Sequence, residues 1–287
     1  MKISKIAIIG SGTMGQGIAQ WFAQQNIQVE LIDIKKEYSE KALINIFSSW
    51  ERLSKKGKFS QLQIDQFKEN IIIKDLEEID PQIDLVIEAI IEDLNIKRQV
   101  FKKLNSICDE HTVFASNTSS IPISDISNEL PNKRQENFIG IHFFNPAPIM
   151  KLVEIIIGKN SSPDLGQNIA KWFDQHKKVP AICKDRPGFI VNRVARNFYG
   201  EPLRIVENFD PHKIENVDQV LKTVGGFRMG PFELMDLIGI DVNYMVTESV
   251  YSAFDKNPRF APHPLQKEMV DKKRNGKKSG KGFYDYE

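Results

Sequence analysis

The chain has 287 residues, with 39 basic and 38 acidic side chains, 41% hydrophobic residues and two cysteines. The near-neutral charge argues against a nucleic-acid-binding protein, and two cysteines argue against a disulfide framework. No apolar run approaches the roughly 18 residues of a membrane span, and a strand-like segment follows Met1 too closely for a cleavable signal. We therefore expect a cytoplasmic protein of one large domain or two, without membrane or nucleic-acid partners.

The first thirty residues predict one parallel crossover unit. Residues 5–9 are apolar and β-branched and end at a glycine, which is typical of a strand buried on both faces. Met14, Ile18 and Phe22 then recur four residues apart, so an amphipathic helix packs on that strand. A second strand follows over residues 28–33, which completes a right-handed strand, helix, strand unit.

The α/β alternation continues to about residue 184. Residues 37–70 predict two helices and residues 95–108 another, with strands at 71–73, 83–90, 112–115, 138–144 and 151–157. An Asp-Arg-Pro-Gly turn begins at residue 185, and only helical patterns follow it, ending in a tail rich in Gly and Lys at 275–282. We predict a Rossmann-type doubly wound α/β sheet over residues 1–184, followed by a smaller all-α domain over 185–287.

Residues 10–15 predict a dinucleotide site. They read Gly-x-Gly-x-x-Gly, follow a predicted strand and open a predicted helix. An acidic residue, Asp33, stands at the end of the second strand, as this motif requires. The first glycine makes the tight turn, the second admits a pyrophosphate and the third brings the helix close to the sheet. The residues of this loop are Gly10, Ser11, Gly12, Thr13, Met14 and Gly15.

Asp33 favours NAD over NADP. Its carboxylate would accept hydrogen bonds from the adenosine ribose and repel a 2′-phosphate. Lys35 and Lys36 could instead neutralise such a phosphate, so NADP is the alternative cofactor. A second alternative is that the glycines make only a strand-to-helix turn.

His142 and Glu154 are the candidate catalytic pair. His142 is followed by Phe143 and Phe144, and Glu154 lies in an otherwise apolar strand, where an isolated carboxylate would need a partner. If the two strands around the Asn-Pro-Ala-Pro turn are neighbours, Glu154 can orient the imidazole and stabilise its protonated form. The alternatives are a core histidine and an edge-strand glutamate facing water. The remaining histidines lie beside charged or turn residues and are expected on the surface: His111, His176, His212 and His263.

The chain resembles the 3-hydroxyacyl-CoA dehydrogenase family, which includes the 3-hydroxybutyryl-CoA dehydrogenases. The resemblance covers nearly the whole chain, in the order expected for the family. Its segments are Gly-Ser-Gly-Thr-Met-Gly-Gln-Gly-Ile-Ala (10–19), Ala-Ser-Asn-Thr-Ser-Ser (115–120), His-Phe-Phe-Asn-Pro (142–146), Met-Lys-Leu-Val-Glu (150–154), Asp-Arg-Pro-Gly-Phe-Ile-Val-Asn-Arg (185–193) and Met-Gly-Pro-Phe-Glu-Leu-Met-Asp (229–236).

The resemblance implies roles for particular residues. His142 would be the base that removes the C3 hydroxyl proton, Glu154 its orienting partner, and Ser119 and Asn192 contacts of the reacting oxygen. Further residues would line the NAD site, namely Asp33, Glu92, Lys97, Asn117, Ser119, Asn145 and Lys278. Ser49 and Lys56 would approach coenzyme A, and the protein would be a homodimer. We read the substrate as a short-chain 3-hydroxyacyl-CoA, such as 3-hydroxybutyryl-CoA.

Three alternatives remain. Residues 194–204 and 225–239 are similar to the branch of the family that acts on 3-hydroxyadipyl-CoA in phenylacetate breakdown, where Arg196, Tyr199 or Arg228 would meet a distal carboxylate. We also expect Pro202 to interrupt a helix, which leaves the acyl specificity open with short chains favoured. A β-hydroxyacid dehydrogenase of the 6-phosphogluconate type has a similar fold but a lysine base, and a non-catalytic NAD-binding relic would keep the fold alone.

Overall fold

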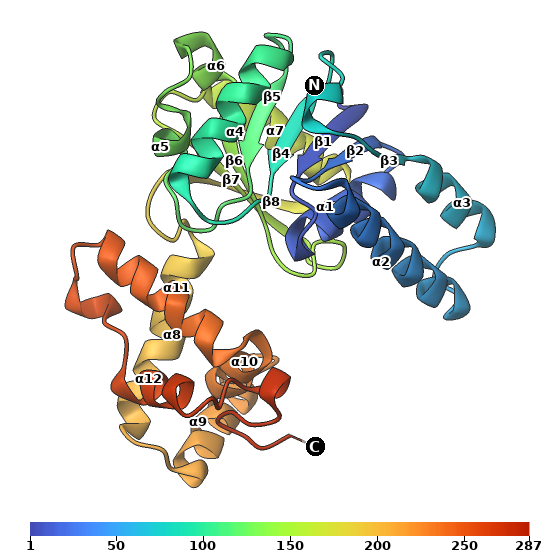
Figure 1. The fold of residues 1–287 in the computed structure, drawn as a ribbon. Helices are drawn as coiled ribbons and strands as arrows, with labels where there is room; N and C mark the ends of the chain where they lie inside the picture. Colours follow the sequence, from blue (N-terminus) through green and yellow to red (C-terminus); the bar gives the residue numbers. More distant parts are fainter. Residues whose placement is uncertain (287) are drawn as a thin grey trace. The chain divides into compact units, whose positions relative to one another are not determined.

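The computed structural model describes residues 1–286 and divides into two compact units, Met1–Arg186 and Pro187–Glu287. The first unit is built on one eight-stranded sheet in the order β3-β2-β1-β4-β5-β6-β7-β8 (Figure 1). The strands are β1 (Lys5–Ile9), β2 (Gln28–Ile32), β3 (Ile71–Ile73), β4 (Leu85–Glu88), β5 (Val113–Ser116), β6 (Phe138–Phe143), β7 (Leu152–Ile157) and β8 (Val179–Lys184).

The direction and order of the strands place the crevice of the sheet. Strands β1 to β6 are parallel, β7 runs antiparallel to β6, and β8 runs parallel to β7. The winding reverses between β1 and β4, and ligands of open α/β sheets bind outside the carboxyl ends of the strands at such a point. The Rossmann-type class predicted from the sequence is confirmed.

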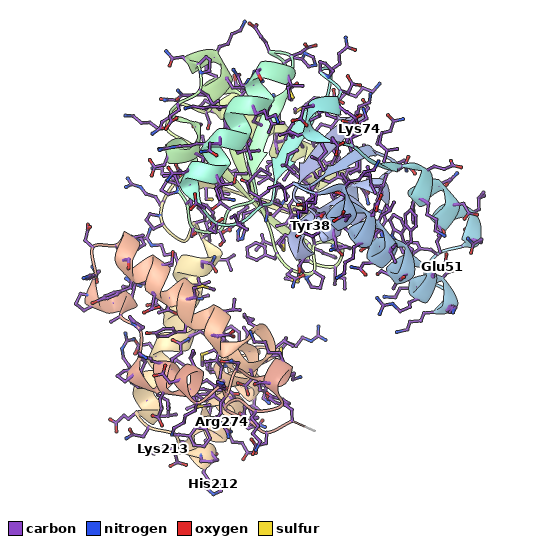
Figure 2. All side chains as sticks on the ribbon, viewed as in Figure 1. Tyr38, Glu51, Lys74, His212, Lys213 and Arg274 are labelled. Carbon is purple, nitrogen blue, oxygen red and sulfur yellow. The ribbon has the colours of Figure 1, made fainter. Side chains whose placement is uncertain are left out.

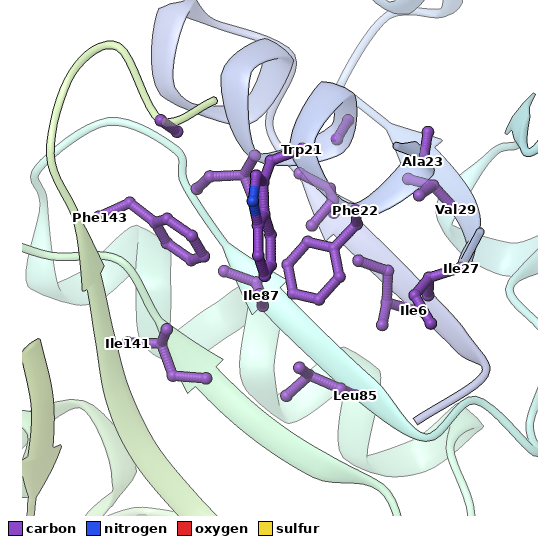
Figure 3. Close-up of a cluster of buried hydrophobic side chains, with 14 of the residues drawn as sticks. Ile6, Trp21, Phe22, Ala23, Ile27, Val29, Leu85, Ile87, Ile141 and Phe143 are labelled. Carbon is purple, nitrogen blue, oxygen red and sulfur yellow. The ribbon is translucent and has the colours of Figure 1, made fainter. Parts of the chain in front are cut away.

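Helices cover both faces of this sheet. They are α1 (Thr13–Ala23), α2 (Lys36–Lys55), α3 (Gln61–Glu69), α4 (Leu94–Ile107), α5 (Ile123–Ser127), α6 (Asn132–Glu136) and α7 (Pro163–Gln175), with a 3₁₀ turn at Leu76–Glu78. Helices α1 and α7 share one core, in which Trp21 stacks on Phe173 and lies against Phe143 of β6 (Figure 3). On the other face Phe101 of α4 packs against Phe138. Residues of β6 therefore alternate between the two layers.

The second unit is helical, as predicted. It contains α8 (Val191–Val206), α9 (Pro211–Thr223), α10 (Pro231–Ile238), α11 (Ile240–Ala253) and α12 (Pro264–Asp271), with 3₁₀ turns at Pro258–Phe260 and Lys277–Ser279. Its own core includes Tyr199, Phe232 and Phe283. In the part of the chain that the structure describes, no helix combines the length and apolar character needed to cross a membrane.

Two local expectations were wrong. Helix α8 continues through Pro202, because the missing backbone donor costs only one hydrogen bond within sixteen residues. His176 and His263 are only half-exposed: His176 stacks on Trp172 and His263 caps α12. His111 and His212 are exposed, as expected, and Figure 2 shows His212 projecting from the start of α9.

The glycine-rich tail is tightly held within the second unit. Asp236 is fully buried and accepts hydrogen bonds from the backbone N–H groups of Phe283 and Tyr284. A Cβ atom at Gly282 would lie 2.1 Å from the Asp236 carboxylate, so a side chain cannot be accommodated there. Arg274 also ties the tail down by donating to the carbonyl of Gly282 (Figure 2).

Candidate active site

The glycine-rich loop leaves the start of α1 open. Gly10 has φ +102°, and a Cβ atom there would lie 2.5 Å from the carbonyl oxygen of Ala89. A Cβ at Gly15 would lie 1.8 Å from the Gly10 carbonyl oxygen, so α1 can approach the turn only with glycine. A Cβ at Gly12 would meet nothing within 4 Å, and no side chain caps the helix. The first N–H groups of α1 are thus available to an anion such as a pyrophosphate.

Asp33 braces this loop. One of its carboxylate oxygens accepts from both the backbone N–H and the hydroxyl of Ser11, at 2.6 Å each. The other oxygen accepts from the backbone N–H of Ile34 at 2.8 Å. The acidic residue that the sequence assigns to a ribose therefore also fixes the glycine loop, while the ammonium of Lys35 lies over the ring of Tyr38.

His142 and Glu154 are brought together by strand register. They are direct partners across the antiparallel pair β6 and β7, so their side chains project from the same face. Nδ1 of His142 lies 2.7 Å from Oε2 of Glu154, and both side chains are more than 90% buried. The His142 ring also lies 4.6 Å from that of Phe144. Because a carboxylate can only accept, Nδ1 of His142 donates to it.

The loop after β5 reaches the same end of the sheet. The Asn117 side-chain oxygen accepts from the backbone N–H of Phe143, which ties this loop to the strand of His142. Ser119 is half-buried two residues further on. Its neighbours Thr118 and Ser120 both donate their hydroxyls to Glu92, so Ser119 is held between two fixed residues.

Sequence reasoning missed Glu88, which is the centre of a buried ion-pair network. Glu88 ends β4 and is fully buried, and its carboxylate accepts from the Lys97 ammonium at 2.6 Å and from the Ser116 hydroxyl at 2.6 Å. Lys97 also lies 3.2 Å from Glu92. The overlooked signal was a glutamate at the end of an apolar strand, the same signal that identified Glu154.

The network changes the interpretation of two predicted cofactor residues. Lys97 is 1% exposed, so its charge is used by Glu88 and Glu92 within the network. Burial opposes ionisation of Glu92, but Lys97 and the hydroxyls of Thr118 and Ser120 outweigh it and hold the pKa of Glu92 below its ordinary value. Glu92 keeps 40% of its side chain exposed and is the member that a ligand can reach.

The predicted coenzyme A residues lie on α2. Ser49 is half-buried, and Lys56 is exposed at the end of the helix. Residues seven apart in a helix lie on one face, about two turns from each other. Asn145 is exposed in the loop after β6.

Asn192 and Lys278 belong to the second unit. Asn192 lies in the first turn of α8, where its carbonyl accepts from Arg196. The Lys278 ammonium pairs with Asp241 at 2.6 Å. Arg196 and Tyr199 are buried, and the Arg196 guanidinium donates to the Asn243 carbonyl and the Thr247 hydroxyl.

A histidine held by a carboxylate and a glycine-rich loop that opens a helix lie at the same carboxyl-end edge of this parallel sheet, and together they define a nucleotide-dependent dehydrogenase. Two family models agree: the NAD binding domain of 3-hydroxyacyl-CoA dehydrogenase matches residues 5–186, and the C-terminal domain of the same family matches residues 188–286. The chain belongs to the 3-hydroxyacyl-CoA dehydrogenase family, and it is an NAD-dependent oxidoreductase.

Individual relatives are similar over the full chain. It is 38% identical to the mitochondrial hydroxyacyl-coenzyme A dehydrogenase of Rattus norvegicus, over 99% of this chain and 91% of the relative. It is 37% identical to the 3-hydroxybutyryl-CoA dehydrogenase of Clostridioides difficile, over 98% and 99%. Over the whole of this chain it is 40% identical to the 3-hydroxyadipyl-CoA dehydrogenase of Escherichia coli, but the match spans only 60% of that protein.

Solved structures agree with these relatives. The (S)-3-hydroxybutyryl-CoA dehydrogenase of Ralstonia eutropha superposes with a TM-score of 0.90 at 33% identity, with all of both chains covered. A 3-hydroxyisobutyrate dehydrogenase of Mycobacterium tuberculosis, 11% identical with a TM-score of 0.55 over 94% of this chain and 92% of the other, shares the fold alone.

Proposed function

We propose that this protein interconverts short-chain 3-hydroxyacyl-CoA and 3-ketoacyl-CoA, with His142 as the base. The observation that carries the proposal is the 2.7 Å contact between His142 Nδ1 and Glu154 in a site shielded from water. The contact sets the tautomer, so Nε2 is the nitrogen that accepts the C3 hydroxyl proton. NAD, when bound, supplies the acceptor for the hydride leaving C3. In the reverse direction the protonated imidazole donates to the ketone.

Glu154 stabilises the imidazolium as it forms, because it brings a negative charge to a buried ring. We assign Ser119 and Asn192 to hydrogen bonds with the reacting oxygen, and Ser49 and Lys56 to coenzyme A. The NAD site would be formed by the glycine loop, together with Asp33, Glu92, Asn117, Asn145 and Lys278.

The interior of the second unit supports a short acyl chain. Arg196 and Tyr199, two of the residues considered for a distal carboxylate, line a cavity of about 10 Å³. That volume holds about one water molecule, which is too little for a carboxylate. The 3-hydroxyadipyl-CoA reaction remains the second candidate, because the relative of that name is 40% identical.

We further propose a cytoplasmic homodimer. An apolar groove of about 410 Å³ lies between α8 and α9, lined by Phe198, Pro202 and Val220 among others. The lining of this groove is almost entirely apolar, and we assign it to contact with a second copy of the chain. Both cysteines are free, which suits a reducing compartment.

The test is oxidation of NADH with acetoacetyl-CoA, monitored as the loss of NADH absorbance. The same assay is repeated with NADPH as the cofactor and with 3-ketoadipyl-CoA as the substrate. His142→Gln is expected to lose most turnover while still binding NADH. His212→Gln, an exposed histidine, is the matched control and should behave as wild type. Near-normal turnover in His142→Gln would remove His142 from this role, and no turnover by the wild type with any 3-ketoacyl-CoA would favour a non-catalytic relic.

A further inference from the structure

The loop that follows the catalytic strand is pinned from two sides. Residues 144–151 connect β6 to β7 and carry the exposed Asn145. On one side, the loop touches α1 at Gly17, where a Cβ would lie 3.3 Å from that of Ala147. On the other side, the carbonyls of Ala147 and Met150 both point at one buried side chain, Lys178.

Lys178 satisfies the hydrogen-bonding needs of two carbonyl groups in this loop with a buried ammonium group. It precedes β8 and is 4% exposed, and its Nζ donates to the carbonyls of Ala147 and Met150 at 2.6 Å each. Within residues 1–286 it makes no ion pair with a carboxylate. Burial lowers the pKa of Lys178 to about 8, so keeping a charge here is unfavourable. A methionine would fill the same space at less cost, which indicates that the two hydrogen bonds are what the position requires.

The same ammonium contacts the cofactor helix and the catalytic strand. It lies 4.8 Å from the ring centroid of Trp21 in α1 and 5.7 Å from that of Phe143, the residue after His142. These two aromatic rings lie next to each other (Figure 3), and their centroids are 5.9 Å apart with the ring planes inclined by 56°. Cation–π contacts of a desolvated lysine are favourable, so Lys178 joins three elements at one point.

We propose that Lys178 is a positioning residue that fixes the loop 144–151 between the nucleotide-binding helix and the catalytic strand, and thereby sets Asn145 relative to NAD. This inference rests on the proposed function for its kinetic consequences, since it assigns Asn145 to the cofactor. Lys178 touches no reacting atom in this proposal and acts through the backbone of the loop. Because small misplacements of reacting groups are costly, its loss should affect turnover more than stability.

The experiment compares Lys178→Met, which keeps the length of the side chain but has no donor, with wild type and with Lys171→Met, an exposed lysine on α7. Lys178→Gln retains an N–H donor group on a shorter, uncharged side chain and replaces the methionine variant if that variant does not fold. Four quantities are measured: kcat, KM for NADH with acetoacetyl-CoA, amide hydrogen exchange at Ile149 and Met150, and Tm. Exchange reports on the loop because Ile149 and Met150 donate their N–H groups to the Pro146 carbonyl.

We expect Lys178→Met to lower kcat about ten- to hundredfold and to raise KM for NADH. Exchange at Ile149 and Met150 should be at least about tenfold faster, with Tm unchanged or higher. The glutamine variant should lie between methionine and wild type, and Lys171→Met should match wild type. Unchanged exchange in a folded Lys178 variant, or a lower Tm with kcat and KM unchanged, would overturn the proposal. The exchange result needs no turnover, so it stands apart from a failure of the proposed reaction.

Discussion

Replacing Glu154 with glutamine removes one charge from the candidate catalytic pair and leaves its shape. The carboxylate lies 2.7 Å from His142 Nδ1, which places the centres of the two charges about 4 Å apart. At an effective dielectric constant near 20, opposite unit charges at that distance attract by about 4 kcal/mol. That attraction exists only when the imidazole is protonated, so it lowers the barrier to proton transfer. Its loss corresponds to about a thousandfold lower kcat.

The assay is steady-state NAD reduction with saturating 3-hydroxybutyryl-CoA, the direction in which His142 takes up the proton, together with NADH affinity and far-UV circular dichroism. Glu154→Gln should keep its fold and its NADH affinity, because strand pairing holds the position of residue 154 and the glutamate does not contact the cofactor in our proposal. Glu110→Gln, an exposed glutamate before β5, is the matched control. A kcat within tenfold of wild type in a folded Glu154→Gln protein would refute the electrostatic argument.

Three further predictions concern the cofactor side of the site and the buried cations. Gly12→Ala should fold normally, because its methyl group enters open space beside the start of α1, but it should bind NADH about tenfold more weakly, because that space is assigned to the pyrophosphate. Gly15→Ala should instead lose stability, because its methyl group would clash with the backbone of Gly10. Lys97→Met should lower the free energy of unfolding by about 3 to 5 kcal/mol in urea titrations, since it leaves Glu88 charged, buried and unpaired. Relative to Lys178→Met, the wild type should gain up to about 3 kcal/mol of stability between pH 8 and 10.5.

The sign of the last prediction follows from proton binding. Burial lowers the pKa of Lys178 from 10.5 to about 8, so between these values the unfolded chain holds a proton that the folded chain has released. Raising the pH therefore favours the folded state. A wild-type stability that falls relative to the variant across this range would contradict this prediction.

For the Lys97 experiment, Lys102→Met on the same helix is the exposed control. A loss of unfolding free energy below about 1 kcal/mol in Lys97→Met would show that Glu88 finds another partner.

Local pattern was sufficient for the central part of the fold. Two apolar strands joined by a short loop, each with one polar residue, predict the pairing of His142 with Glu154. Cross-strand neighbours follow from the alternation of side chains and from strand register. Residues 158–184 were not assigned to elements. Strand β8 lies at the sheet edge with half-exposed residues and contains Pro180, so it lacks the apolar run of an inner strand.

Long-range contacts explain what could not be predicted. Lys178 is 31 residues from Ala147, and nothing in its neighbours indicates that it turns inward to two carbonyls. The ion pair between Lys97 and Glu88 could not be predicted, because sequence does not show that α4 returns its first turn over the end of β4. The sequence shows only that the tail at 275–282 is rich in Gly and Lys, and not that Gly276 and Gly282 are required where the backbone approaches Asp236.

The two halves of the site are held by different interactions and should respond differently to mutation. His142 and Glu154 are positioned by backbone hydrogen bonds between β6 and β7, so replacing either side chain changes chemistry without moving its partner strand. The loops that carry Ser119 and Asn145 lie outside the strand hydrogen bonds and depend on side chains instead. Glu92 accepts hydrogen bonds from the loop of Ser119, and Lys178 donates to the loop of Asn145. Substitutions in the catalytic pair should therefore lower kcat at constant cofactor affinity. Substitutions at the supporting residues should change kcat and cofactor affinity together, because they displace backbone.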